Sequence, residues 1–136
     1  MNQPSFDIIN DRIREVLSKF PQIVFATVFG SAATGRITPL SDVDIAIAGE
    51  RELSFATKMD LSVALSKALG HEVDLVDLHA VSGLILKEAL CSGEIIHRGK
   101  PAIYAGLLKK MWYNQQDMMP HYRRILKNNC ERFVNG

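Results

Sequence analysis

Apolar residues recur along this chain with two periods, and the changes of period divide it into alternating helices and strands. Helical spacing before Pro21, across 53–69 and across 82–91 predicts three helices, the second of which should end at Gly70. Apolar runs rich in β-branched residues predict strands at 23–29, from about 41, at 71–78 and at 94–97. With a last helical segment, the order is helix, strand, strand, helix, strand, helix, strand, helix.

The alternation of helices and strands predicts an α/β (α+β) fold. The 136 residues show no repeat, low-complexity tract or obvious linker, and they suffice for one modest hydrophobic core. We therefore predict a single domain over residues 1–136, in which a basic helical segment occupies about 101–135.

Composition indicates a soluble globular protein and gives no sign of a membrane segment. The chain is 47% hydrophobic and 23% charged, and no apolar run approaches the roughly 20 residues that span a bilayer. The first residues lack the basic and apolar stretches of a secretory signal, so we expect a cytoplasmic location. Cys91 and Cys130 show no spacing typical of metal ligands, which favours reduced thiols.

The segment after the first predicted strand carries the candidate chemistry, in the pattern G-S-x10-D-x-D. Gly30 and Ser31 stand at the end of the strand, and Asp42 and Asp44 complete the pattern. A glycine lets the backbone come close to a ligand, and a hydroxyl beside backbone N–H groups suits phosphate oxygens. The period of two along a strand places both aspartates on one face, roughly 7 Å apart, where a divalent cation would fit between them.

A third carboxylate comes from the strand predicted at 71–78, which carries Asp74 and Asp77 on opposite faces. We choose Asp74, because it lies at mid-strand between apolar residues, where an unpaired charge would be costly. Asp77 lies near the end of the strand and is interpreted as meeting water or capping the residues that follow. The sequence thus predicts that three aspartates hold Mg²⁺ or Mn²⁺ beside the phosphates of a nucleotide.

These residues resemble the signature of the nucleotidyltransferase superfamily of DNA polymerase β type, and specifically of its minimal nucleotidyltransferases. The resemblance covers most of the chain and implies a small mixed β-sheet flanked by helices. It implies that the catalytic, metal-binding residues are Asp42, Asp44 and Asp74. It also implies that Gly30 and Ser31 bind the triphosphate of ATP, and we expect Arg36 and Ser41 to contribute to the same binding site.

The chain departs from the pattern of the family at Thr34, a position where many relatives have an arginine. Arg36 is expected to take over the triphosphate role, and the alternative is an ordinary exposed loop arginine.

Many minimal members of the superfamily resemble antitoxins that are encoded beside a HEPN-domain RNase toxin and silence it by adding AMP to a tyrosine. The resemblance therefore implies an Mg²⁺-dependent protein adenylyltransferase with a HEPN-type toxin as its partner. Two alternatives stay open. One is nucleotide transfer to a small molecule or an RNA end, and the other is an antitoxin that acts by binding alone.

Charge is distributed unevenly behind the net value of +1. Residues 1–99 carry 9 Lys and Arg against 13 Asp and Glu, whereas residues 100–136 carry 7 against 2. The basic segment interleaves its charges with aromatic residues and methionines. It is either an amphipathic helix packed on the sheet or a surface for a protein or RNA partner.

Overall fold

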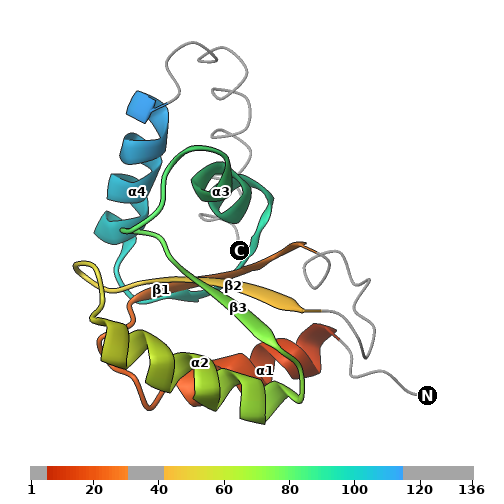
Figure 1. Ribbon diagram of the computed structural model, residues 1–136. Coiled ribbons are helices and arrows are strands. Elements are labelled where there is room, and N and C mark those ends of the chain that lie inside the picture. The colour runs from red at the N-terminus through yellow and green to blue at the C-terminus, as the bar shows by residue number, and fades with distance from the viewer. Residues whose placement is uncertain (1–5, 31–41, 115–136) are drawn as a thin grey trace.

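The computed structural model describes residues 6–30 and 42–114, in which helices cover both faces of a four-stranded sheet (Figure 1). The helices are α1 (Phe6–Leu17), α2 (Phe55–Leu69), α3 (Gly83–Lys87), the π-helical turn η2 (Glu88–Ser92) and α4 (Pro101–Asn114). The strands are β1 (Phe25–Phe29), β2 (Val43–Ala48), β3 (Val73–Asp77) and β4 (Glu94–Arg98). This order confirms the predicted alternation of elements.

The sheet is mixed, as the resemblance implied. Its strand order is β3-β2-β1-β4, in which β1 runs antiparallel to both neighbours and β2 runs parallel to β3. A parallel pair cannot be joined by a tight turn, so the chain crosses over through α2 between the two strands. Among the described residues, β3 pairs with β2 alone and is therefore an edge strand of the sheet.

Two hydrophobic cores form, one on each face of the sheet. On the first face α1 and α2 pack their apolar sides against the odd-numbered residues of β2, Val43, Ile45 and Ile47. On the second face α3, η2 and α4 cover Ala46 and Ala48. The alternation of side chains along β2 therefore decides which side chains lie under which helices.

The ends of α2 follow from local chemistry. The Ser54 hydroxyl accepts a hydrogen bond from the Thr57 N–H at 3.2 Å, which satisfies one donor of the first turn. Gly70 adopts a φ of 69° and ends the helix, as the sequence predicts. Helix α1 instead ends at Leu17, before Pro21, because tighter turns follow: the N–H groups of Lys19 and Phe20 bond three residues back.

The helix predicted at 82–91 is divided between α3 and the wider turn η2. Helix α4 packs on the second face of the sheet, where the Tyr104 ring stacks on Phe25 with centroids 5.1 Å apart. Packing on the sheet is thus shown for the start of the basic segment. Residues 115–136 lie outside the described part of the chain.

Cys91 lies in η2 and is partly buried as a free thiol, with its Sγ 3.6 Å from the Met111 Sδ on α4. Burial raises the pKa of this thiol to about 11. Cys130 lies outside the described residues. Within residues 6–30 and 42–114, no helix is both long and apolar enough to cross a membrane.

Candidate active site

Asp44 on β2 and Asp74 on β3 are register partners in the parallel pair of strands. Such partners project from the same face of a sheet, and neighbouring strands lie about 5 Å apart. Val43 and Ile45, on either side of Asp44, pack under α1 and α2, so the two carboxylates belong to the opposite face. The structure thus brings these two predicted site residues together.

The charges around Asp44 are acidic. Asp42 is exposed and directly precedes β2. The pKa of the Asp44 carboxyl is raised, first by partial burial and then by the charges of Asp74 and Asp42, with a smaller effect of Glu88. A hydrogen bond between the Asp44 and Asp74 side chains raises this pKa further. Because two carboxyl groups make such a bond only by sharing a proton, the cluster favours a bound cation.

Glu88 belongs to this acidic group although no motif in the sequence includes it. Its charge reaches Asp44 because η2, which Glu88 opens, packs against the sheet on the face that carries Asp44. The only signal in the sequence is an acidic residue within an apolar segment. No characteristic spacing in the sequence links Glu88 to the other carboxylates, because only the packing of η2 brings Glu88 near Asp44.

Gly30 directly follows β1 and lies against the Asp44 side chain. Its φ is 69°, a conformation that residues with a Cβ seldom adopt. A Cβ at this position would collide with Oδ2 of Asp44. The absent side chain of Gly30 thus leaves room for the Asp44 carboxylate, while the close approach of a ligand to this glycine stays a prediction.

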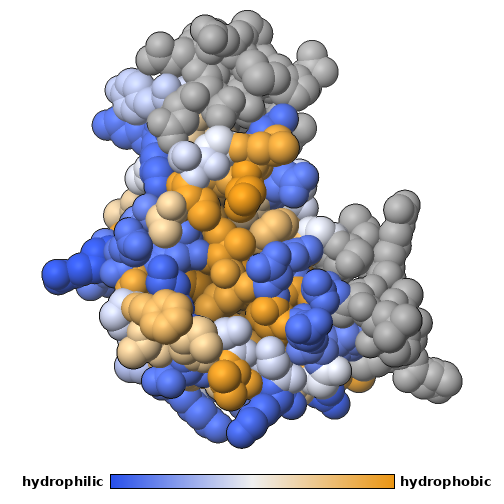
Figure 2. Space-filling view, in the orientation of Figure 1, coloured by the Kyte–Doolittle hydropathy of each residue, from blue (hydrophilic) through white to orange (hydrophobic). Residues whose placement is uncertain are grey.

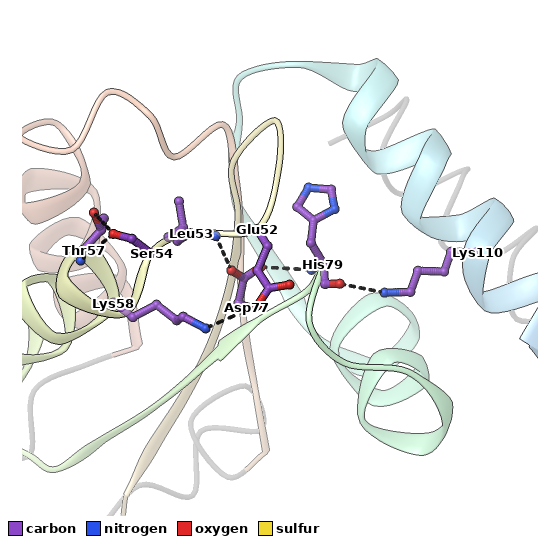
Figure 3. Close-up of polar contacts among 8 residues, drawn as sticks. All are labelled: Glu52, Leu53, Ser54, Thr57, Lys58, Asp77, His79 and Lys110. Atoms are coloured by element: carbon purple, nitrogen blue, oxygen red, sulfur yellow. Dashed lines mark hydrogen bonds and ion pairs between the residues drawn. The ribbon is translucent and has the colours of Figure 1, made fainter.

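The reason for preferring Asp74 over Asp77 needs correction. Asp74 was expected to be enclosed by apolar residues, but it is the second residue of an edge strand and is exposed. Asp77 is the buried aspartate, with 4% of its surface exposed. Its Oδ2 accepts the Leu53 N–H at 2.8 Å and its Oδ1 accepts the His79 N–H at 3.0 Å (Figure 3). The capping interpretation of Asp77 is therefore confirmed, and contact with water is not.

Further contacts fix the end of β3 to its surroundings (Figure 3). The His79 ring, through Nε2, bonds the Gly49 carbonyl at 2.8 Å, where the chain leaves β2. From α4 the Lys110 ammonium donates to the carbonyl oxygens of Leu78 and His79 at 3.3 and 3.1 Å. These bonds lie beyond the C-terminal end of β3, so they hold the strand that carries Asp74 without touching the site.

Three predicted nucleotide contacts, Ser31, Arg36 and Ser41, lie outside the described residues. Of the predicted site, the described part therefore contains Gly30, Asp42, Asp44 and Asp74.

Within residues 6–30 and 42–114, no three His, Cys, Asp or Glu side chains are arranged as a ready metal site. The donor set nevertheless fits Mg²⁺ or Mn²⁺, since carboxylate oxygens are the ligands of these ions. Mg²⁺ in particular is commonly held by one or two carboxylates together with substrate phosphates. The pair Asp44 and Asp74, in which the pKa of the Asp44 carboxyl is raised, meets that requirement without a complete cage of protein ligands.

Comparison with known proteins agrees with this geometry. Residues 11–101 match the family described as "Polymerase beta, Nucleotidyltransferase". The protein adenylyltransferase MntA of Shewanella oneidensis is 28% identical over 108 residues, which are 79% of this chain and 67% of MntA.

Solved structures of toxin–antitoxin complexes share the fold. A chain of a toxin–antitoxin complex with AMP-PNP is 24% identical, with a TM-score of 0.70 over 88% of this chain and 96% of that chain. A complex of a tri-AMPylated Shewanella oneidensis HEPN toxin with its MNT antitoxin gives a TM-score of 0.67 at 21% identity, over 90% and 97% of the two chains. With paired aspartates on β2 and β3 beside the glycine that ends β1, and a family match over more than half its length, this chain belongs to the polymerase β-type nucleotidyltransferase family.

Proposed function

We propose that this chain is an antitoxin that transfers AMP from ATP to a tyrosine of a cognate HEPN-type toxin, with Mg²⁺ as cofactor. The observation that carries the proposal is the pairing of Asp44 with Asp74 beside Gly30. The name of the relative MntA, a protein adenylyltransferase, supports AMP as the transferred group and a protein as the acceptor. The complex of an MNT antitoxin with an AMPylated HEPN toxin supports the class of partner.

In the proposed reaction, the acceptor oxygen forms a bond to the α-phosphorus of ATP while the bond from that phosphorus to pyrophosphate breaks. A divalent cation, when bound, neutralises phosphate charge and lowers the pKa of the acceptor hydroxyl. Asp42, Asp44 and Asp74 are the residues that would hold it. Gly30, Ser31, Arg36 and Ser41 would bind the triphosphate.

Asp74 has a second role in the proposal. It is exposed on the edge strand, so an acceptor hydroxyl can approach it from solvent. Its carboxylate would therefore receive the proton that the hydroxyl releases. Asp44, which is partly buried and in contact with its neighbours, is the positioned member of the pair.

The test uses ATP labelled on either the α- or the γ-phosphate, together with the proposed HEPN-type partner protein and Mg²⁺. The α-label is expected on that protein and the γ-label is not, because pyrophosphate leaves. Asp44→Asn should abolish the transfer while circular dichroism shows an intact fold. If the toxin is neutralised without becoming labelled, the result supports an antitoxin that acts by binding alone. Label on RNA or on a small molecule supports nucleotide transfer to that acceptor.

A further inference from the structure

Helix α2 is apolar on two sides. It buries Leu61, Leu65 and Leu69 against the first face of the sheet. It also exposes Phe55, Met59 and Val63, with 76%, 48% and 49% of their surfaces accessible. These three residues recur every four positions and so form one stripe on the helix surface. A surface helix normally has one apolar stripe, so a second one indicates burial against another molecule.

Figure 2 shows apolar side chains on the near side of α2, the side that lies beside the open edge of β3. Helix α1 packs along one flank of α2 and reaches β4, where the Arg14 Nε donates to the Ile96 carbonyl at 3.0 Å. Because β3 and β4 are the two edges of the sheet, the flank of α2 that faces away from α1 lies on the β3 side. Figure 1 shows α2 and β3 together on the near side of the molecule.

The edge of β3 offers backbone groups as well. The Val43 N–H bonds the Glu72 carbonyl and the Leu78 N–H bonds the Ile47 carbonyl, both at 2.9 Å. In a parallel pair, alternate residues of a strand bond the same neighbour. Since 72 and 78 face β2, the backbone groups of Val73 and Leu75 point toward the open edge.

Helix α3 extends the apolar surface on the other side of β3. Leu84 and Ile85 are 67% and 49% exposed. Apolar side chains gather over α3, β3 and the near side of α2 (Figure 2). We call this surface the β3 face, and it consists of the open edge of β3 with the exposed residues Phe55, Met59, Val63, Leu84 and Ile85.

The charges of the β3 face select the kind of partner. Glu72 directly before β3, Asp74 on β3 and Glu88 after α3 are exposed, and residues 72–78 include no Lys or Arg. A second copy of this chain would place like charges opposite one another along the edge, which is unfavourable. A nucleic acid would be repelled by the same charges. An apolar protein surface bordered by basic residues complements both features.

We propose that the β3 face is the docking surface for the protein that carries the acceptor hydroxyl, a protein with an apolar contact surface and a basic border. The inference rests on the proposed function, because Asp74 belongs to the same edge strand and a bound acceptor is thereby brought to it. The stripe on α2 supplies the apolar anchors, and the acidic residues attract the basic border.

The experiment measures binding and AMP transfer separately, with the HEPN-type toxin proposed above as the partner serving as the probe. Phe55→Glu combined with Met59→Glu should weaken binding by at least about 30-fold, the effect of losing a central anchor. Ile8→Glu is the matched control, because Ile8 is 44% exposed on α1, which lies toward β4, the opposite edge of the sheet. The control should bind within about twofold of the unmodified chain, as expected for a residue outside the contact surface.

Unchanged binding by the folded double variant would overturn the inference, and transfer of AMP by that variant would leave the proposed function standing. Lost binding in the double variant, with no AMP transfer by the unmodified chain, supports the inference and contradicts the proposed reaction. Analytical ultracentrifugation of the isolated chain tests whether a second copy of this chain covers the β3 face. A dimer that the double variant dissociates would show that a second copy, and not the acceptor, covers this face.

Discussion

At the scale of single residues, the position of the Asp44 carboxylate depends on the missing side chain of Gly30. Gly30→Ala would add a Cβ against Oδ2 of Asp44 and would place alanine at a φ of 69°. We expect nucleotide transfer to fall by about 100-fold, because displacement of a reacting group by about 1 Å has an effect of that size. The measurement is the initial rate of transfer at saturating ATP.

Gly70→Ala is the control that separates the effect of the backbone conformation from the effect of contact with Asp44 in Gly30→Ala. Gly70 has the same φ of 69°, but a Cβ there meets no atom within 4 Å. Both variants should lose about 1 kcal/mol of stability from the unfavourable backbone conformation, and only Gly30→Ala should lose activity. Equal activity in the two variants would show that contact with Asp44 has no catalytic consequence.

The pair Asp44 and Asp74 gives a prediction for stability. In EDTA, Asp74→Asn should raise the free energy of unfolding by up to about 1 kcal/mol, a small value because the site is partly exposed to solvent. The physical reason is that an amide donates to the Asp44 carboxylate without adding a second negative charge. Urea denaturation measures the effect.

In Mg²⁺, the unmodified chain should have a higher free energy of unfolding than Asp74→Asn. The unmodified chain should gain stability when Mg²⁺ replaces EDTA, since an ion that binds only the folded state stabilises it. Asp74→Asn should gain less, because it has lost a ligand. A variant that is less stable in EDTA, or that responds to Mg²⁺ like the unmodified chain, would contradict the account of the carboxylate pair.

At the scale of elements, the placement of β3 depends on contacts beyond its C-terminal end. Asp77→Ala would leave the N–H groups of Leu53 and His79 without their acceptor, and we expect a loss of about 2–4 kcal/mol. Asp77→Asn should lose less, because one oxygen remains, although its amide group then faces an N–H. Thermal denaturation compares both with Glu52→Gln, where the exposed pair with Lys58 at 3.9 Å predicts a change below about 0.5 kcal/mol. A loss in Glu52→Gln as large as in Asp77→Ala would contradict the role of Asp77.

The sequence predicts the elements well because their signals are local. The apolar run of β1, the period of two in β2 and the cap at Gly70 each depend on neighbours in the chain. Burial along an edge strand depends instead on distant parts of the chain. Asp74 is exposed because β3 pairs with one described strand, and Asp77 is buried because the loop at Leu53 lies over it. The proximity of Glu88 to Asp44 is likewise a property of packing between distant elements.

At the scale of the whole molecule, the three layers assign different tasks to the two faces of the sheet. Helices α1 and α2 bury the first face, where β2 and β3 lie in register. The second face carries the acidic pair, with α3, η2 and α4 around it. Strand β3 carries Asp74 and borders the exposed apolar surface, so the proposed chemistry and the proposed docking share one edge of the sheet.

The apolar spacing along α2 does not distinguish residues buried in the core from residues exposed on the surface. Phe55, Met59 and Val63 have the helical period of core residues, yet they are exposed. Periodicity identifies an apolar stripe but not the molecule that covers it. A complex is therefore needed to explain residues that the isolated fold does not bury.

The central claim is that the paired aspartates of β2 and β3 transfer a nucleotide to a protein. Intact-mass spectrometry of the HEPN-type protein, after incubation with this chain, ATP and Mg²⁺, tests it most directly. We predict a gain equal to one or more AMP groups with the unmodified chain and no gain with folded Asp44→Asn. AMP addition that persists in folded Asp44→Asn would contradict the claim.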